Sequence, residues 1–264
     1  MSAQRELNTV AAICARDTVR WVREWKNNLL FSFFFPIAFM GILGGTIGQN
    51  LASGLGYNYL QFVLLGMVAN VTIQFTMMGV TSLIEERETG FTQEIFVSPA
   101  SRYSIILGKI LGASVTALPP LAIFFVVGAA MGVPLTLTGI GLVLLVVPVM
   151  FLLGGGLGVL VSGIFSSSPK AVDQAVIMIM FPQMFLSGAL IPIGASTGVL
   201  AILSRLMPAT YVVDLLRAAF YHGTPTYSKV VLYNPLIDLA VSIGLSIVFF
   251  VLGTYLFVRN ERNR

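Results

Sequence analysis

The sequence predicts an all-α, polytopic membrane protein in which a single transmembrane domain takes in the whole of residues 1–264. Two observations carry this prediction. Hydrophobic residues make up 56% of the chain and charged residues only 10%, whereas soluble domains carry about 25% charged residues. The charges also gather in short segments between long apolar stretches. A surface this poor in charge could not stay in solution, so the chain belongs in a lipid bilayer.

Six apolar stretches are each long enough to cross a bilayer as a helix, which takes about 20 residues. They cover residues 29–49, 59–83, 104–131, 138–165, 171–193 and 235–258. Pro119 and Pro120 lie within the third stretch and predict a kink or a break there. Gly154-Gly155-Gly156 indicates close packing or flexibility in the fourth. The first stretch begins near Leu29, too late for a signal peptide, so no cleavable leader is expected.

Residues 1–28 precede the first predicted span and contain an amphipathic helix. Four arginines lie on one face at helical spacing, and apolar residues lie on the other. Tryptophan on the apolar face suits a helix lying in the cytoplasmic membrane interface. A soluble helix packed on a partner protein is the alternative. The apolar face consists of Leu7, Val10, Ala11, Cys14, Thr18, Trp21, Val22 and Trp25.

The placement of lysine and arginine predicts the orientation. Twelve of the 15 fall in the N-terminal segment, in the segments after the second and fourth spans, and in the C-terminal tail. Only Arg205, Arg217 and Lys229 lie on the other side. Cytoplasmic loops carry the excess of positive charge, so both termini are expected to face the cytoplasm. We interpret the net charge of +4 as topology, and expect no nucleic-acid partner.

Residues 194–234 form a longer connection on the predicted outer side, before the last span. Prolines punctuate it, and the run LSRLMPATYVVDLLRAAFYHG between them predicts one or two short helices. We expect an external cap or a re-entrant hairpin. Such backbone is tolerated at membrane depth only where protein or a water-filled cavity covers it.

The segment 84–103 is the most charged part of the chain between spans. Four of the eleven acidic residues fall here, at Glu85, Glu86, Glu88 and Glu94. Gly90 permits a turn into a second short helix with an apolar edge, and such a helix suits docking on a cytoplasmic partner. From the residues alone, a solvated loop with ordinary surface charge remains an equal alternative.

Two motifs resemble those of type-2 ABC exporter permeases. The run Glu86-Arg87-Glu88-Thr89-Gly90 followed by Ser98-Pro99-Ala100-Ser101-Arg102 is similar to the family signature between the second and third spans. The run from Met207 to Arg217 is similar to the family's N-P-x-T-Y-x-x-D-x-[LF]-R before the last span, with Met207 in place of Asn. Daunorubicin-resistance permeases look most similar, and permeases for lipopolysaccharide or teichoic acid are close competitors.

This resemblance implies a permease subunit in a prokaryotic plasma membrane, not an enzyme. It implies a homodimer that works with two separate ATPase subunits and exports a hydrophobic or amphipathic cargo, drug-like or lipid-like. The chain has no G-x-x-x-x-G-K-[ST] phosphate loop, so ATP and Mg²⁺ would be bound by the partner and no cofactor by this chain. The coupling residues implied are Glu85, Glu86, Arg87, Glu88, Gly90, Glu94, Pro99 and Arg102.

Polar and methionine side chains within the spans are candidates for a cargo pathway, because polar groups in hydrocarbon need a partner helix or a pathway to face. Hydrogen bonding between helices is an equally good explanation of them. The candidates are Asn70, Gln74, Met77, Met78, Met178, Phe181 and Phe185, with Gln174 and Gln183 also expected to face inward.

Two other classes of membrane protein fit less well. A secondary transporter usually carries an acid or base deep within a span, but here every acid lies outside the predicted spans or at their ends. An intramembrane enzyme would need a catalytic cluster near one surface, and the acids of 84–94 suit docking better. One histidine, His222, and one cysteine, Cys14, predict neither a metal site nor an internal disulfide.

Overall fold

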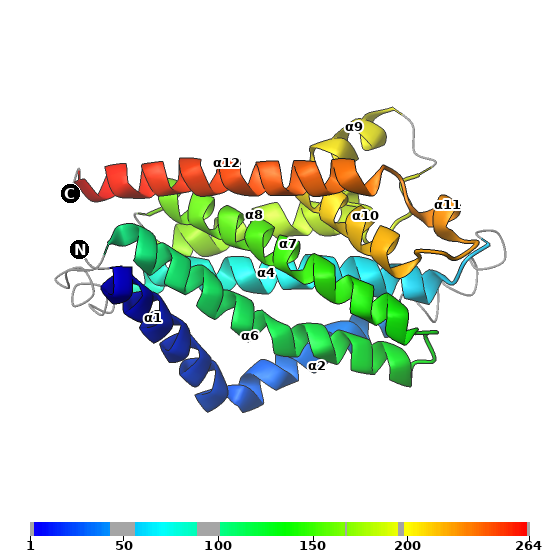
Figure 1. Ribbon diagram of the computed structural model, residues 1–264, viewed down its shortest axis with the longest axis horizontal. Coiled ribbons are helices and arrows are strands. Elements are labelled where there is room, and N and C mark those ends of the chain that lie inside the picture. Colours follow the sequence, from blue (N-terminus) through cyan, green and yellow to red (C-terminus); the bar gives the residue numbers. More distant parts are fainter. Residues whose placement is uncertain (1–2, 43–55, 89–100, 167, 195–197, 263–264) are drawn as a thin grey trace.

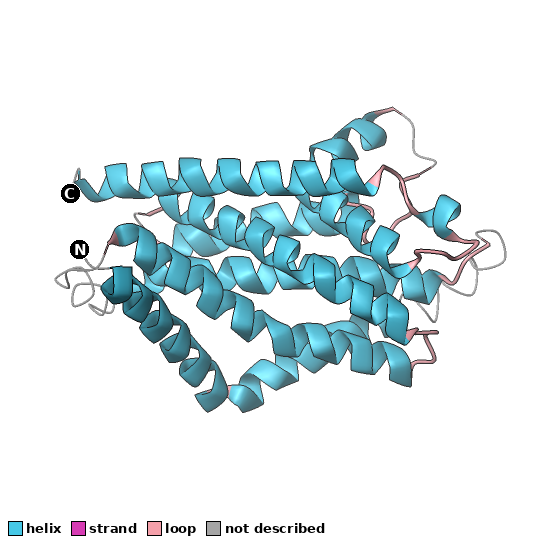
Figure 2. Ribbon diagram, in the orientation of Figure 1, coloured by secondary structure: helices cyan, strands magenta, loops and turns pink. Residues whose placement is uncertain are grey.

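The computed structural model describes residues 3–42, 56–88, 101–166, 168–194 and 198–262, and every regular element in these ranges is a helix (Figures 1 and 2). The predicted all-α class is confirmed. The helices are α1 (Ala3–Arg23), α2 (Trp25–Ile42), α4 (Tyr59–Glu88), α6 (Arg102–Ala130), α7 (Leu137–Ile164), α8 (Pro169–Leu186), α9 (Val199–Leu206), α10 (Pro208–Phe220), α11 (Tyr227–Val230) and α12 (Pro235–Arg262).

The long helices form an antiparallel bundle along one axis (Figure 1). α4, α7 and α12 run toward the end that holds both chain termini, and α6 and α8 run away from it. We call this end the terminal end, and the opposite end, which holds α11 and the start of α4, the distal end. α1 and α2 form a V against the side of the bundle. α1 begins and α12 ends at the terminal end of the bundle (Figure 1).

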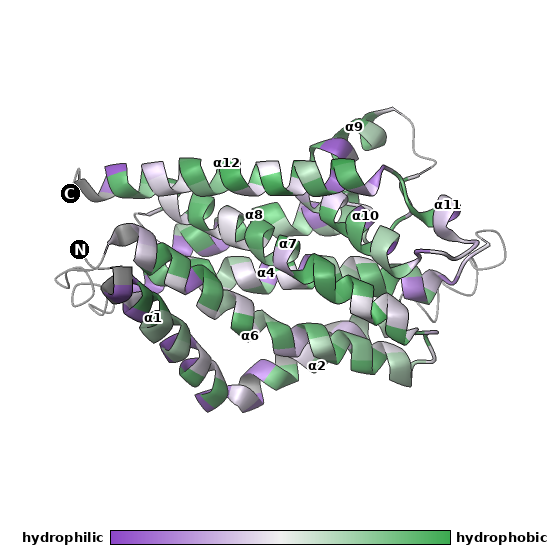
Figure 3. Cartoon of the chain, viewed as in Figure 1, coloured by the Kyte–Doolittle hydropathy of each residue, from purple (hydrophilic) through white to green (hydrophobic). Residues whose placement is uncertain are grey.

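α4 is the central helix of the bundle, in contact with α6, α7, α8 and α10. Every residue from 61 to 73 is buried. This run is mostly apolar, as expected of a helix surrounded by other helices, and its polar residues Gln61, Asn70 and Thr72 are buried as well. The outer helices instead expose large apolar side chains such as Leu145 and Val251, and Figure 3 shows apolar residues along their outward faces. This surface is suited to contact with lipid.

Three successive glycines of α7 let three helices approach it at once. A Cβ on Gly154 would lie 2.6 Å from the Ile73 carbonyl oxygen of α4. On Gly155 it would lie 2.9 Å from Ile110 of α6, and on Gly156 it would lie 2.9 Å from the Ser246 carbonyl oxygen of α12. Side chains rarely tolerate such distances, so these glycines serve close helix packing.

Four of the described helices contain segments long and apolar enough to cross a membrane: Tyr59–Glu86, Tyr103–Ala130, Leu137–Ile164 and Pro235–Asn260. α9 and α10, which meet at an angle of 85°, add a fifth if they count as one broken span. The first predicted span begins as the shorter apolar helix α2, and its residues 43–49 lie outside the described residues. α8 ends at Leu186, well before the predicted boundary at 193. A count of six spans thus stays a prediction.

Two further expectations can be compared with the structure. α6 continues from Arg102 to Ala130 through Pro119 and Pro120, so the two prolines do not break it. In the described part of 194–234, α9 and α10 correspond to the one or two short helices expected around Met207, and a further short helix, α11, was not predicted. The sharp bend between α9 and α10 falls at Met207-Pro208, because proline cannot continue a preceding helix.

Candidate functional site

A cluster of five charged residues joins three helices at the terminal end of the bundle. Lys109 of α6 places its Nζ 2.7 Å from Glu86 Oε1 of α4 and 3.1 Å from Asp17 Oδ2 of α1. Arg16 Nη2 lies 2.8 Å from Glu86 Oε2 and 2.6 Å from Asp17 Oδ1. Arg20 Nη1 lies 3.4 Å from Glu86 Oε1. We call these five residues the ion cluster.

Burial makes the ion cluster interdependent. The side chain of Lys109 is only 2% exposed, and that of Glu86 is 8% exposed. A buried charge is tolerated when it is paired, and removing one partner leaves the other uncompensated. Burial alone would lower the pKa of Arg16, but its hydrogen bond to Asp17 and the charge of Glu86 raise that pKa above the ordinary value. The cluster therefore holds α1, α4 and α6 together through mutual neutralisation.

Two glycines of α6 let α1 reach Lys109. A Cβ on Gly108 would lie 3.1 Å from Ile13 of α1, and a Cβ on Gly112 would lie 3.0 Å from Asp17. The i,i+4 spacing puts both glycines on one face, beside Lys109. This arrangement was not predicted from the sequence, where Lys109 counts only among the positive charges expected on the cytoplasmic side. The signal that could have found it is a lysine between two glycines one turn apart, near the end of a span.

Glu6 of α1 makes a second link, to the first turn of α6. Its Oε2 accepts hydrogen bonds from Ser101 Oγ at 2.9 Å, from the Ser101 backbone N–H at 3.3 Å and from Ser104 Oγ. Ser101 also caps α6 by accepting from the Ser104 N–H at 3.1 Å. Hydrogen bonds from the Ser104 and Ser101 hydroxyls lower the pKa of Glu6. An acid at a helix N-terminus is further stabilised by the helix dipole.

The predicted coupling residues fall in three groups. Glu85 is exposed on α4, whereas Glu86 points inward and is 7% exposed. Arg87 and Glu88 end α4 and Arg102 begins α6, at the terminal end. Gly90, Glu94 and Pro99 lie outside the described residues. The structure thus brings both ends of segment 84–103 against α1, and it places Glu86 in an internal contact rather than on the surface.

The predicted interface helix exposes part of its apolar face. Leu7 and Val22 are 68% and 55% exposed, and Trp25, which the structure places at the start of α2, is 49% exposed. The face of α1 that packs on the bundle combines Val10 and Ile13 with Arg16 and Arg20, so the predicted arginine face turns partly inward. α1 therefore has one side on the bundle and an apolar side left open, which suits a helix at a membrane surface.

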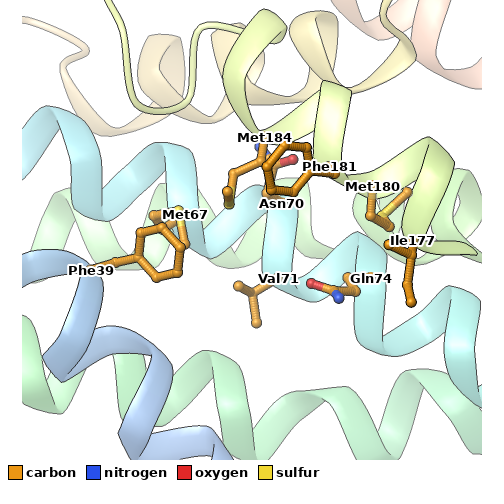
Figure 4. Close-up of a pocket in the computed structure, with 9 residues that line it drawn as sticks. All are labelled: Phe39, Met67, Asn70, Val71, Gln74, Ile177, Met180, Phe181 and Met184. Atoms are coloured by element: carbon orange, nitrogen blue, oxygen red, sulfur yellow. The ribbon is translucent and has the colours of Figure 1, made fainter.

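A cavity of about 240 Å³ lies between α2, α4 and α8 (Figure 4). Of the pathway candidates, Asn70, Gln74 and Phe181 line it. The full lining is Phe39, Met67, Asn70, Val71, Gln74, Ile177, Met180, Phe181 and Met184. We call it the α8 cavity. It is mainly apolar and rich in methionine, with two amides and no charged side chain, which suits an adaptable site for apolar ligands.

The other pathway candidates do not line the α8 cavity. Met77 is fully buried under α7, where its carbonyl oxygen would lie 2.9 Å from a Cβ on Gly158. Met78 faces a second cavity, beside α1. Met178 and Phe185 are 75% and 36% exposed on the outward face of α8.

The polar residues of the spans divide between helix contacts and open positions. Asn70 Nδ2 donates to the Gly66 carbonyl oxygen at 3.3 Å and to Ser187 Oγ at 3.2 Å. Gln183 is buried, and its Oε1 accepts from the Ala209 N–H at 3.2 Å. Gln174, expected to face inward, is exposed on α8. Gln74 has no hydrogen-bond partner among the described residues, so its amide is available within the α8 cavity.

The second motif, 207–217, builds a buried centre toward the distal end. Asp214 of α10 accepts from the backbone N–H groups of Leu232 and Tyr233 at 2.8–2.9 Å. Arg217 Nη2 donates to the carbonyl oxygen of Phe62 on α4 at 3.2 Å, and to two carbonyls after α8. The Arg217 guanidinium carbon also lies 3.4 Å from the Phe62 ring centroid. These motif residues hold α10 in place.

No group of three or more histidine, cysteine or acidic residues that could hold a metal occurs in the part of the chain that the structure describes. His222 lies exposed in the turn after α10, and Cys14 is a half-buried free thiol on α1.

The profile described as "ABC-2 family transporter protein" matches residues 49–258, most of the chain. The chain belongs to this family. The match takes in α4 to α11, most of α12 and both motifs. Homologues in this family are named as transport permeases, which are membrane subunits without catalytic activity. Membership of the family agrees with the bundle of long apolar helices.

Curated relatives carry similar names. The Escherichia coli K12 inner membrane transport permease YhhJ is 26% identical over 162 residues, covering 61% of this chain and 43% of YhhJ. The chain thus spans less than half the length of that ABC-2 relative. Nodulation protein J of Rhizobium leguminosarum bv. trifolii is 25% identical over 96% of this chain and 92% of its own length. The E. coli K12 inner membrane transport permease YadH is 23% identical over 79% and 81%.

Proposed function

We propose that the chain is the transmembrane subunit of an ABC exporter that moves a hydrophobic or amphipathic cargo out of the cytoplasm or the inner leaflet. It works as a homodimer with two separate ATPase subunits, which bind ATP and Mg²⁺. The terminal end faces the cytoplasm of a prokaryotic cell. The observation that carries the proposal is the ion cluster, which ties the helices on both sides of segment 84–103 to α1.

The ion cluster supports coupling because of where it lies in the chain. Segment 84–103, which carries the family-like motif, starts at the end of α4 and finishes at the start of α6. A partner that pushes on this segment acts on both helices at once. Through Glu86 and Lys109 the push also reaches α1, since Asp17 and Arg16 pair with those residues. A push on segment 84–103 can then move α1, α4 and α6 together.

The α8 cavity supports an apolar or amphipathic cargo. Its methionines and aromatic rings adapt to varied shapes, and Gln74 offers an amide for one polar group. A lipid-linked polysaccharide or teichoic acid would need a cation to hold its phosphate, and none lines this cavity. A secondary transporter gains no support here either, because no acid or base lines the cavity.

The exposed face of α8 supports a seam between two copies of the chain. Ile177, Met178 and Phe181 are 65%, 75% and 62% exposed, and they follow helical spacing along one stripe. The α8 cavity borders this stripe through Ile177 and Phe181. A second copy across α8 would therefore place the cavities of the two copies on either side of the seam.

Cysteine cross-linking tests the seam in native membranes. In a Cys14→Ser background, Met178→Cys or Phe181→Cys on α8 is expected to give an oxidised dimer. Val251→Cys, on the exposed face of α12, is the matched control and is expected to stay monomeric. Cross-linking at Val251 but not at either α8 position would contradict this seam.

Reconstitution with the cognate ATPase tests the coupling. Glu86→Gln and Glu88→Ala are expected to lower cargo moved per ATP hydrolysed by about three- to tenfold. Asp173→Asn changes an exposed acid on α8, outside the ion cluster, and is expected to leave this ratio unchanged. Normal ratios in both glutamate variants, with folded protein, would refute the coupling role. Transport without any ATPase would refute the exporter itself.

A further inference from the structure

A second cavity, of about 320 Å³, lies between α1, α4 and α6. We call it the α1 cavity. The V of α1 and α2 borders it, with Trp21 of α1 and Glu24 of the turn between the two helices in its wall. Its volume falls in the range of sites for small molecules, about 300–1,000 Å³. Nothing in the coupling role requires such a space.

The wall of the α1 cavity changes from charged to apolar along the helices. On α4 the lining begins at Glu85 and Glu86 near the terminal end and reaches Met78 and Phe75 deeper in the bundle. The eleven helical steps from Phe75 to Glu86 span roughly 16 Å at 1.5 Å per step. On α6 the same change runs from Lys109 to Ala113. The wall is therefore amphipathic along α4 and α6, while Asp17, Arg20, Trp21 and Glu24 line the side formed by α1 and the turn after it.

Two carboxylates in the charged part of the wall are not held in close ion pairs. Lys109 is taken up by Glu86 and Asp17, and Arg20 lies 3.4 Å from Glu86 and 3.7 Å from Glu24. Glu85 is exposed and has no ion-pair or hydrogen-bond partner among the described residues. Glu24 has only the long contact to Arg20, and its side chain is 57% exposed. An incoming cation would find these two carboxylates accessible.

Trp21 adds a surface that also favours cations. An indole face attracts ammonium groups, and the attraction grows when water is excluded. The same ring gives apolar contact to a hydrocarbon body. A ligand anion is disfavoured because the wall carries four acids, Asp17, Glu24, Glu85 and Glu86, against two bases, Arg20 and Lys109. A purely apolar ligand would leave the carboxylates of Glu85 and Glu24 with nothing but water.

We propose that the α1 cavity binds an amphipathic amine, with its ammonium group between Glu85, Glu24 and Trp21 and its apolar body against Phe75 and Met78. The amine has one of two sources, the ammonium headgroup of a membrane aminolipid or a free cationic amphiphile. Binding at this site is separate from export and does not depend on the proposed function.

Trp21 can report binding, because the chain has only two tryptophans. In a Trp25→Phe background, full-length protein in nanodiscs of phosphatidylcholine is titrated with a brominated long-chain alkylamine, which quenches indole fluorescence. Saturable quenching of Trp21 is expected. The brominated alcohol and alkyl sulfate of equal chain length are expected to bind at least about tenfold more weakly, since they lack the cation. Equal quenching by all three would overturn the proposal.

The variant Glu85→Gln removes the carboxylate that has no partner and leaves the ion cluster intact. It is expected to raise the Kd of the amine by about tenfold. Met78→Ser, in the apolar part of the wall, is expected to weaken binding of the long-chain amine more than that of a short-chain one. Asp173→Asn is the matched control, with an unchanged Kd. An unchanged Kd in both Glu85→Gln and Met78→Ser would overturn the proposal even if quenching is saturable.

Nanodiscs that contain phosphatidylethanolamine distinguish the two sources. If this lipid competes with the alkylamine probe, the site takes an aminolipid headgroup. If the probe binds equally well with or without it, the site takes a free amphiphile, and both results support the shared chemistry. The titration needs neither ATP nor an ATPase partner, so its failure would leave the proposed coupling untouched.

Discussion

A buried cation lies near each end of the bundle, and the two are neutralised in opposite ways. Lys109, near the terminal end, is paired with carboxylates from two other helices, Glu86 of α4 and Asp17 of α1. Arg217, toward the distal end, donates to three backbone carbonyls and lies over the ring of Phe62. Carboxylates on separate helices can part and re-form, whereas backbone carbonyls move only with the fold. We therefore expect the ion pairs at the terminal end to rearrange when the helices move, and the contacts of Arg217 toward the distal end to stay fixed.

The largest effect on stability is expected from removing the guanidinium of Arg217. Arg217→Met leaves the carbonyls of Gly188 and Ala189 without a partner and removes the contact with Phe62. We expect a loss of about 5 kcal/mol of stability, measured by thermal unfolding in nanodiscs. Arg217→Lys is not expected to restore it, because an ammonium cannot reproduce the planar fork.

The matched control for Arg217 is Arg205→Met. Arg205 is exposed on α9, and its replacement is expected to change stability by less than about 0.5 kcal/mol. Similar melting of both variants would show that the distal centre is not the fixed part of the molecule.

Removing the terminal cation is expected to cost less and to be reversible. Lys109→Met leaves Glu86 and Asp17 as buried, partly unpaired carboxylates, at a cost of about 3 kcal/mol. Adding Glu86→Gln and Asp17→Asn to Lys109→Met is expected to recover most of this stability. The triple variant is still expected to hydrolyse ATP without moving cargo, when reconstituted with its ATPase.

Lys170→Met, on the exposed start of α8, is the control for Lys109 and is expected to leave both stability and transport unchanged. A triple variant that is both stable and fully coupled would remove the distinction between the two ends.

A smaller effect on the fixed end is expected from Gly66→Ala. A Cβ at Gly66 of α4 would lie 2.3 Å from the carbonyl oxygen of Ala189, which accepts a hydrogen bond from Arg217. The backbone must shift, and we expect a loss of about 1–3 kcal/mol in thermal unfolding. Gly141→Ala on α7 meets nothing within 4 Å and is expected to gain up to about 1 kcal/mol of helix propensity. Equal effects would argue against tight packing at Gly66.

The smallest effect is expected at the terminal end, from Glu6. The pKa of Glu6 is lowered in the folded protein, so its contribution is present above the ordinary carboxyl pKa of 4.5 and is lost as the pH falls through the folded value. When the pH is lowered through the folded pKa of Glu6, hydrogen exchange of α1 and of the first turn of α6 is expected to become faster in the wild-type protein, relative to the intrinsic exchange rate at each pH. Glu6→Gln is expected to show the faster exchange already at neutral pH. An unchanged rate in this variant would exclude a role for Glu6 in holding α1.

Much of this fold follows from the sequence because lipid imposes simple rules. Long apolar runs gave the positions of α4, α6, α7 and α12, and the family-like motif 207–217 marked a centre that the structure places at Asp214 and Arg217. The inward turn of Glu86 was not predictable, since an acid at the end of a span usually faces water. Lys109 looked like an ordinary cytoplasmic charge for the same reason, and only Gly108 and Gly112 hinted that another helix covers it. Which pathway candidates share a cavity depended on helix rotation, which a mostly apolar run does not encode.

The three glycines of α7 divide the molecule into a frame and its moving parts. Gly154, Gly155 and Gly156 each seat a different neighbour at near-contact with the α7 backbone, so a rotation of α7 would push against α4, α6 and α12 simultaneously. These four helices should therefore travel as one rigid body through any transport cycle. The freedom left to the chain lies in α1, α2 and α8, which line the two cavities together with α4 and α6 of the frame.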